Sequence, residues 1–240
     1  MHIAATIGCE GVQIDARQEL RPAEITDTGL REVRKMLADL NLRVGSVAFP
    51  TRRGYADPTE LDRRVEATIA AMQLASKLGA RVLVCNLGSL PGAAAEAPRA
   101  LLVEVIASLA ERGMKLGVQL AAQISCDDLA QVADFIAQLP EGTLFLDLHP
   151  PQIMAEGHSP QKFVGELGGH VAHVYAVDAV RDLSAGRNRE VELGRGSTDF
   201  PAILGQLEEF GYAGWVTIQR TGSQQTVEDF ANAVKFLRAI

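Results

Sequence analysis

Short runs of Val, Ile and Leu recur along this chain and alternate with longer stretches whose apolar residues follow a helical period. A parallel sheet covered by helices produces this pattern, because a helix must return the chain between successive strands. The seven runs that we expect to be strands occupy residues 11–16, 43–50, 81–88, 118–125, 144–150, 173–179 and 215–221. One such architecture is the α/β barrel, which commonly forms a single domain at this length. We therefore expect residues 1–240 to be a single domain.

The stretches between the runs carry helix start and stop signals. Residues 57–60 read Asp-Pro-Thr-Glu, which predicts a helix start ahead of an apolar stripe, and Gly79 predicts its end. Thr226 and Asp229 form a capping-box pattern for the last helix. Further apolar stripes are Leu30, Val33, Leu37 and Leu40; Leu61, Val65, Ile69 and Met72; and Leu129, Val132, Ile136 and Leu139.

Composition excludes several classes of protein. The net charge of −7 has the wrong sign for a protein that follows phosphate backbones, so we expect no nucleic-acid partner. No apolar run approaches the roughly 20 residues that span a bilayer, and no signal peptide is recognisable, so we expect no membrane partner and a cytoplasmic location. Cys9, Cys85 and Cys126 lack metal-ligand spacing and are expected to be reduced thiols.

The start of the chain is unusual for a closed barrel. Periodicity does not separate a barrel from a doubly wound sheet, but no Gly-x-Gly-x-x-Gly motif follows the first run, which disfavours a dinucleotide fold. Residues 2–8 read as the end of a helix and no strand precedes them. We therefore expect a barrel that lacks its first strand, with unpaired edges on strands 11–16 and 215–221 that favour homo-oligomer formation.

Polar residues stand near the carboxyl ends of the expected strands, where barrel active sites lie. Burying several such groups is unfavourable unless they serve a common pocket. We expect His158, His170 and His173 to be solvated or capping residues instead. The strand-end set is Gln13, Asp15, Asn86, Gln123, Asp147, His149, Tyr175, Asp178, Gln219 and Arg220.

Four segments resemble the sugar phosphate isomerase/epimerase family of xylose isomerase-like barrels. They read GCEGVQIDAR (8–17), HVYAVDAVRD (173–182), ELGRGSTDFPAIL (192–204) and EEFGYAGWVTIQ (208–219). The resemblance implies a TIM-type (β/α) barrel. It also implies a Mn²⁺, Zn²⁺ or similar ion held by Glu, Asp, His and Glu at the mouth, with the glutamates moving protons beside a sugar carbonyl.

The positions that match this ligand set depart from it. Gln123 replaces the first Glu, Tyr175 replaces the His and Gln219 replaces the last Glu, whereas Asp147 is retained. Gln13 replaces a further Glu of the family. Neutral amides are poor ligands for divalent ions, and a phenol with a pKa of about 10 stays protonated at neutral pH. We therefore expect no cofactor and no metal ligands, with Mn²⁺ or Zn²⁺ as the ion if the substituted site still binds one.

The segment after the expected strand 173–179 is predicted to be a long loop, which carries Arg181, Arg187 and Arg189 and includes a second candidate site at residues 194–197. Two glycines flank Arg195, and a helix start follows at residues 197–199. Backbone N–H groups and a helix dipole favour anions at this place in a barrel, so we expect Arg195 to contact an anionic or polyhydroxylated group. A tight turn with solvated arginines explains the same residues.

Three functions remain open from the sequence. The first is an isomerase or epimerase acting on a sugar, sugar phosphate or polyol, with Asp147 and His149 as catalytic groups. The second is a non-catalytic carbohydrate- or anion-binding pseudoenzyme that uses Gln13, Gln123, Tyr175 and Gln219 as neutral hydrogen-bonding groups. The third, an endonuclease IV-like phosphodiesterase, requires a richer metal cluster and a basic groove, and neither is visible.

Overall fold

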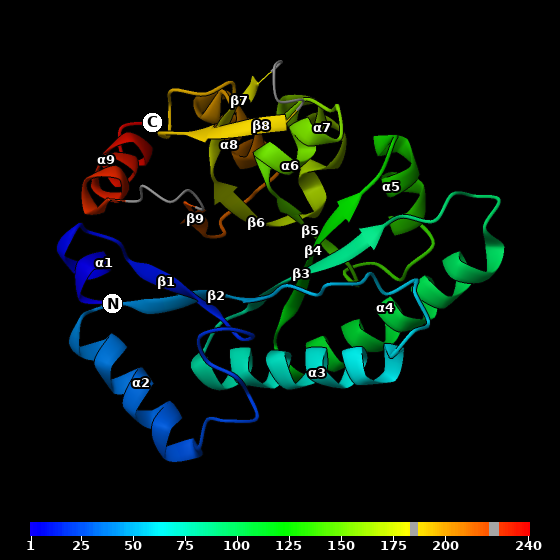
Figure 1. Cartoon of the computed structure of the whole chain (residues 1–240), viewed down its shortest axis with the longest axis horizontal. Coiled ribbons are helices and arrows are strands. Elements are labelled where there is room, and N and C mark those ends of the chain that lie inside the picture. The colour runs from blue at the N-terminus through cyan, green and yellow to red at the C-terminus, as the bar shows by residue number, and fades with distance from the viewer. Residues whose placement is uncertain (183–186, 221–225) are drawn as a thin grey trace.

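The computed structural model describes residues 1–182, 187–220 and 226–240, and its centre is a curved sheet of seven strands (Figure 1). All six strand pairings are parallel, so the carboxyl ends of the strands lie together at one end, the mouth. In spatial order the strands are β1 Gly11–Asp15, β2 Arg43–Phe49, β3 Val82–Ser89, β4 Gln119–Ser125, β5 Phe145–Leu148, β6 Val171–Ala176 and β9 Val216–Ile218. Each of the seven predicted runs overlaps one of these strands, which confirms the predicted sheet, although β3 ends one residue later and β6 begins two residues earlier than predicted.

The barrel is not closed by a strand. Within the described residues β1 pairs only with β2 and β9 only with β6. Residues 2–8 contain a short helix, α1 (His2–Thr6), as predicted. The fold is therefore a TIM barrel without a sealed first strand, and the gap between β1 and β9 is called the seam below.

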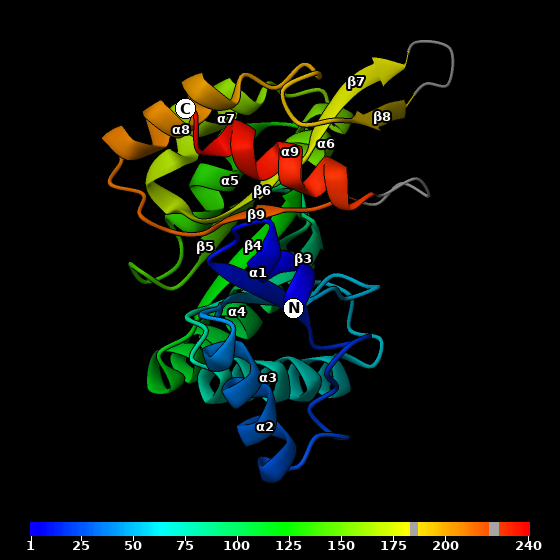
Figure 2. The same ribbon diagram turned by 90° about the vertical axis from the view of Figure 1, so that its left-hand side faces the viewer.

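Two contacts bridge the seam. At the start of β9 the Trp215 ring reaches across to β1 and β2, where a Cβ on Gly45 would lie 2.7 Å from the ring and one on Gly11 2.9 Å from it. The guanidinium of Arg43 lies 4.9 Å from the ring centroid. Helix α9 (Val227–Leu237) lies beside α1 in both views (Figures 1 and 2), and Arg238 donates to the Gly8 carbonyl at 2.6 Å.

The remaining helices pack on the outside of the sheet with their apolar stripes inward, as predicted. The capping box of Thr226 and Asp229 is present, and Gly79 ends its helix at φ 81°. These helices are α2 Asp27–Asp39, α3 Leu61–Leu78, α4 Glu96–Leu116, α5 Leu129–Ile136, α6 Pro150–Ala155, α7 Pro160–Leu167 and α8 Phe200–Glu209, with a 3₁₀ turn at Gly168–His170. None of the helices in the described part of the chain is long and apolar enough to cross a membrane.

Two local predictions were wrong. Helix α3 begins at Leu61 and not at residues 57–60, because Asp57 accepts the Thr59 N–H at 2.8 Å in a turn and Glu60 adopts a left-handed φ of 52°. The segment after β6 was expected to be a long loop. It forms an antiparallel hairpin of β7 (Asp178–Asp182) and β8 (Arg187–Val191), which projects from the sheet in Figure 2.

The core has two layers. Most buried side chains lie between the sheet and its helices. A smaller cluster of Val82, Val84, Ala121, Tyr175 and Val177 packs separately from it. Because side chains alternate between the faces of a strand, polar residues two positions away from this cluster share its inner face. Examples are Asn86 after Val84, Gln123 after Ala121 and His173 before Tyr175.

Candidate functional site

Inward-pointing polar side chains from six strands form one hydrogen-bonded network towards the mouth. The period of two along a strand explains this, since most of their neighbours in sequence are apolar and belong to the core between the sheet and its helices. The strands β1, β2, β4, β5, β6 and β9 contribute Gln13, Ser46, Gln123, Asp147, His173, Tyr175 and Thr217.

The centre of the network is the pair of Asp147 and His173. Nδ1 of His173 lies 2.6 Å from Oδ1 of Asp147, and Gln123 donates to the other carboxylate oxygen at 2.8 Å. His173 has no exposed surface and Asp147 is 4% exposed. The prediction that His173 is a solvated or capping residue was therefore wrong, because β6 starts at Val171 and carries His173 into the interior. His170 is exposed, as predicted, and His158 is half-buried.

The other ring nitrogen of His173 connects three further strands. Nε2 lies 2.8 Å from the Thr217 hydroxyl on β9, 3.1 Å from the Ser46 hydroxyl on β2 and 3.4 Å from the Gln13 amide nitrogen on β1. A carboxylate on Nδ1 assigns the ring proton to that nitrogen, which leaves Nε2 as the acceptor in a neutral ring. His173 thus joins opposite sides of the barrel and both sides of the seam.

Tyr175 connects this network to the mouth. Its hydroxyl donates to Gln13 Oε1 at 2.8 Å, and its ring makes edge contacts with His173 and His149, at centroid distances of 4.7 and 5.2 Å. Burial, with a smaller contribution from the negative charge of Asp147, raises the pKa of Tyr175. The phenol is therefore a neutral donor at physiological pH.

His149 and Gln219 lie next to Tyr175 at the end of the barrel. His149 is the N-cap of α6, and its Nδ1 accepts the Gln152 N–H at 3.4 Å. Its Nε2 lies 3.4 Å from Gln219 Oε1. Both side chains are half-buried, so they are within reach of a ligand at the mouth.

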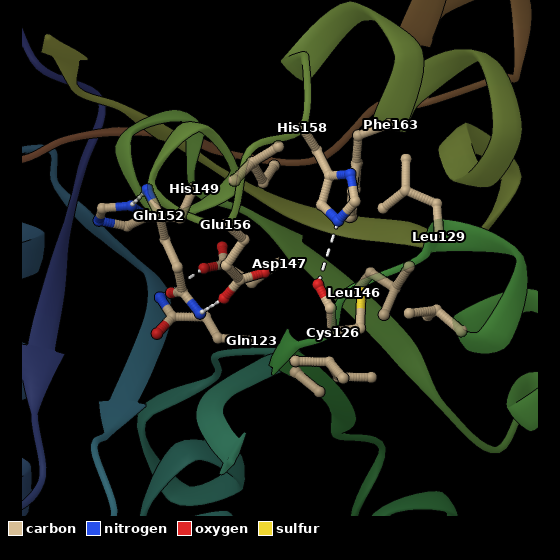
Figure 3. Close-up of a pocket in the computed structure, with 14 residues that line it drawn as sticks. Gln123, Cys126, Leu129, Leu146, Asp147, His149, Gln152, Glu156, His158 and Phe163 are labelled. Atoms are coloured by element: carbon tan, nitrogen blue, oxygen red, sulfur yellow. Dashed lines mark hydrogen bonds between the residues drawn. The ribbon is translucent and has the colours of Figure 1, made fainter. Parts of the chain in front are cut away.

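A pocket opens between the ends of β4 and β5 and the helices α5, α6 and α7 (Figure 3). Its polar side carries Gln123, Asp147, Gln152 and Glu156, and Gln152 lies 3.4 Å from a Glu156 oxygen. On the other side, apolar groups lie beside Cys126, whose carbonyl is 3.0 Å from Nε2 of His158. Burial, and then the charge of Glu156, raises the pKa of the Cys126 thiol to about 11, so it is not a thiolate nucleophile at neutral pH.

Besides His173, four residues of this site were not predicted from the sequence. Ser46 and Thr217 are small hydroxyls between apolar neighbours on β2 and β9, so alternation along those strands was the available signal. Gln152 and Glu156 lie one helical turn apart just after β5, a spacing that marks a shared face only once α6 is known.

Two predicted residues organise local turns. Asp15 Oδ1 accepts the N–H groups of Arg17 and Gln18 at 2.7 and 2.9 Å. Asn86 Oδ1 accepts the Gly88 N–H at 2.7 Å. Both lie near the mouth, but these oxygens already have partners within the protein.

The predicted anion loop is bonded within the protein. Asp178, 1% exposed, accepts the N–H groups of Gly194, Gly196 and Thr198 at 3.1, 2.7 and 3.2 Å. Arg195 is 76% exposed on its side chain and pairs with Glu192 at 2.9 Å. The backbone donors expected for an external anion serve Asp178 instead, so the sequence interpretation of this loop needs correction. Arg220, at the end of the barrel, pairs with Glu190 on β8 at 3.2 Å.

The donor set at the mouth does not fit a divalent ion. The positions matched to the family ligands hold one carboxylate, Asp147, and both its oxygens are hydrogen-bonded. The other three supply two neutral amides and a protonated phenol. Among residues 1–182, 187–220 and 226–240, no group of three or more His, Cys, Asp and Glu side chains is arranged to hold a metal.

Comparison with known families assigns the architecture. The sequence profile of the family described as "Xylose isomerase-like TIM barrel" matches residues 1–240, the whole length of this chain. This chain belongs to the xylose isomerase-like TIM barrels. A comparison with curated proteins found no match to this sequence.

Solved structures show the same fold at low identity. A xylose isomerase domain protein from Planctomyces limnophilus superimposes with a TM-score of 0.87 at 19% identity, covering 99% of this chain and 90% of that chain. A xylose isomerase-like TIM barrel protein from Mycobacterium smegmatis, in complex with magnesium, gives 0.78 at 15% identity, covering 98% and 84%. D-allulose 3-epimerase from Methylomonas sp., in complex with D-allulose, gives 0.72 at 20% identity, covering 98% and 81%. Sugar isomerases and epimerases are thus structural neighbours of this family member.

Proposed function

We propose that this barrel binds a small polyhydroxylated ligand at its mouth without a divalent ion, as a non-catalytic relative of the sugar isomerases and epimerases. The observation that carries the proposal is the satisfaction of Asp147 by His173 and Gln123. The one carboxylate retained from the family ligand set serves an internal network. Recruiting it to an ion requires breaking a buried, charge-assisted hydrogen bond.

Neutral amides at the mouth suit hydroxyl groups. No hydrogen bond is made by Gln123 Oε1 or Gln219 Nε2 within the described residues, which leaves one acceptor and one donor for a ligand. A sugar hydroxyl both donates and accepts, so a set of amides, Tyr175 and His149 matches a polyol without a net charge. The D-allulose complex of a structural neighbour supports the same class of ligand.

One observation favours an enzymatic alternative. His149 is half-buried at the mouth, and its imidazole is held between Gln219 and Tyr175. An imidazole in such a place can accept a proton from the carbon next to a carbonyl, as a metal-independent isomerase or epimerase requires. Both proposals place the ligand at the mouth, and they differ in whether the protein converts it chemically.

Thermal-shift and calorimetric titration with D-allulose, D-fructose, D-tagatose and myo-inositol in EDTA tests binding. We expect at least one to raise the melting temperature, and the Gln123→Ala and Gln219→Ala variants to weaken its binding by about tenfold each. Gln18→Ala, on an exposed side chain, is the matched control and should bind as the native protein does. Binding that appears only after Mn²⁺ or Zn²⁺ is added contradicts the proposal.

Proton exchange distinguishes the two alternatives. The binding ketose is incubated with the protein in D₂O, and its proton spectrum is followed by NMR. Unchanged spectra support the non-catalytic proposal. Deuterium incorporation beside the carbonyl that disappears in His149→Gln supports the enzyme.

We also propose that the chain forms homo-oligomers through the seam. Within the described residues β1 and β9 each have one unpaired edge, and Met1 and Ile3 are exposed. Both features support association, because unpaired strands beside apolar groups promote it. Light scattering should give a mass above the monomer, and Ile3→Lys should lower it. A monomer at every accessible concentration contradicts the proposal.

A further inference from the structure

The carboxylate of Asp178 occupies an arrangement of backbone donors that elsewhere binds phosphate. Oδ2 accepts the N–H groups of Gly194 and Gly196, and Oδ1 accepts those of Ala179 and Thr198, at distances from 2.7 to 3.2 Å. Successive N–H groups that converge on one point form an anion-binding concavity. Here the anion is a side chain of the same protein, 16 to 20 residues earlier than the three loop donors.

The rest of the loop has no amide left for a second anion. The Arg195 N–H donates to the Glu192 carbonyl at 3.0 Å and the Ser197 N–H to the Ala179 carbonyl at 2.9 Å. All five amides of residues 194–198 therefore have partners within the protein. The loop also fits closely around its carboxylate, since a Cβ on Gly196 would lie 2.0 Å from Oδ1 of Asp178.

The charges around the mouth oppose a phosphorylated ligand as well. The pocket in Figure 3 is lined by two carboxylates, Asp147 and Glu156, and by no Lys or Arg among the described residues. The nearby Arg195 points into solvent beside Glu192, and Arg220 is paired with Glu190. The pocket has a volume of only about 20 Å³, so a ligand at the mouth would contact its rim and not enter it. A phosphate dianion held against this rim would lose hydration and meet like charge, and the pocket lining offers it no cationic partner.

We infer that this barrel is specific for unphosphorylated, uncharged polyols, because Asp178 occupies the anion-binding loop of residues 194–198 beside its mouth. The inference rests on the proposed function for the site itself. It specifies the class of ligand: the family resemblance allows both sugars and sugar phosphates, and the inference selects the neutral sugars.

The first experiment compares matched ligands on the native protein. Thermal shift is measured with D-fructose against D-fructose 6-phosphate, D-allulose against D-allulose 6-phosphate, and inorganic phosphate alone. We expect a neutral sugar to bind at least tenfold more tightly than its phosphate, and inorganic phosphate to give no shift beyond that of chloride at equal ionic strength. Tighter binding of either phosphorylated sugar overturns the inference.

The second experiment empties the loop and does not depend on any sugar. Asp178→Ala should lower the melting temperature, and formate, acetate or inorganic phosphate should restore part of the loss by entering the freed donors. Chloride at the same ionic strength should not. The native protein, whose loop is filled, should show no such rescue, and equal stabilisation of both proteins by phosphate overturns the inference.

Asp178→Asn is the control for Asp178→Ala, because it removes the charge and keeps the side-chain volume. Its amide fills the same volume but turns one acceptor into a donor that faces the loop N–H groups, so we expect a lower melting temperature without anion rescue. If anions raise the melting temperature of Asp178→Asn as much as that of Asp178→Ala, the side chain at residue 178 does not occupy the loop. If no sugar binds the native protein, the proposed function fails, and anion rescue in Asp178→Ala still decides whether the loop is self-occupied.

Discussion

Nδ1 of His173 lies 2.6 Å from Oδ1 of Asp147, with both side chains closed to solvent, on adjacent strands of the open barrel. The distance is that of a charge-assisted hydrogen bond. The family resemblance implies an ion on the carboxylates at the mouth. Here an imidazole satisfies Asp147 on one side and a glutamine amide does so on the other.

Asp147→Asn should therefore destabilise the fold as well as any ligand complex. One of the two Asp147 acceptors becomes a donor, facing either His173 Nδ1 or Gln123 Nε2, which are both donors. We expect the free energy of unfolding to fall by about 3 kcal/mol, the scale for breaking a buried charged hydrogen bond. Urea unfolding measures it.

Asp134→Asn, on an exposed position of α5, is the control and should change the free energy of unfolding by less than about 0.5 kcal/mol. Equal effects of the two substitutions would show that Asp147 and His173 form no significant pair in solution.

All three tyrosines of the chain should resist ionisation while it is folded. Burial is the largest cause that raises the pKa of Tyr55, Tyr175 and Tyr212, and nearby Cys85 or Asp147 adds to it. A raised pKa in the folded state gives stability that is fully present below about pH 10, the unfolded value, and is lost as the pH rises above it. Phenolate absorbance should thus appear together with loss of the circular dichroism signal.

The urea-unfolded chain provides the reference, because its tyrosines should titrate near pH 10. A phenolate that forms near that pH while the circular dichroism spectrum is unchanged would mean that the tyrosine concerned is not buried as the structure has it.

Two glycines, Gly196 in the loop around Asp178 and Gly205 in α8, give opposite predictions. Gly196→Ala places a Cβ against the Asp178 carboxylate and should lower the free energy of unfolding by about 2 kcal/mol or more. Gly205→Ala, in α8 with nothing within 4 Å of the added Cβ, should raise it by about 0.5–1 kcal/mol through helix propensity. Chemical unfolding of both variants checks the opposite signs, and a neutral Gly196→Ala would refute the close fit of the loop.

The sheet can be predicted from the sequence because each of its strands has a local sequence signal. Runs such as residues 81–88 and 118–125 are apolar, short and bounded by helical stripes, so their period and length identify them without tertiary information. The hairpin of β7 and β8 gives no such signal, because its strands read DAVRD and RNREV and lack an apolar face. It was interpreted as a loop for that reason.

The site is less predictable because its contacts are long-range. His173 meets Ser46 across 127 residues and Thr217 across 44, and no local pattern distinguishes this from a strand-edge histidine. Asp178 and the loop of residues 194–198 show the same limitation. The glycines predict backbone donors for an anion, but only the fold shows that these N–H groups donate to a carboxylate of the protein itself.

The substitutions at the mouth should be reversible. Gln123→Glu and Gln219→Glu, combined with Tyr175→His, restore two carboxylates and an imidazole beside Asp147, which is the donor set that the family resemblance implies. We expect the triple variant to be less stable than the native protein without metal, because three like charges then face one another in a partly buried site. Mn²⁺ or Zn²⁺ should recover that loss by binding only the folded state, with a shift in melting temperature that grows with metal concentration.

The control is the double variant of Gln123→Glu and Gln219→Glu, which keeps Tyr175 and its hydrogen bond to Gln13. Without the imidazole this double variant should bind either ion more weakly than the triple variant does, and the native protein should bind it more weakly still. Binding removes water from the ion, and one anionic ligand does not compensate for the lost hydration. Equilibrium dialysis followed by elemental analysis measures the bound metal directly. One equivalent of metal retained by the native protein through dialysis, and lost in Asp147→Ala, would show that Asp147 leaves His173 to ligate an ion and that the two glutamines suffice as its partners.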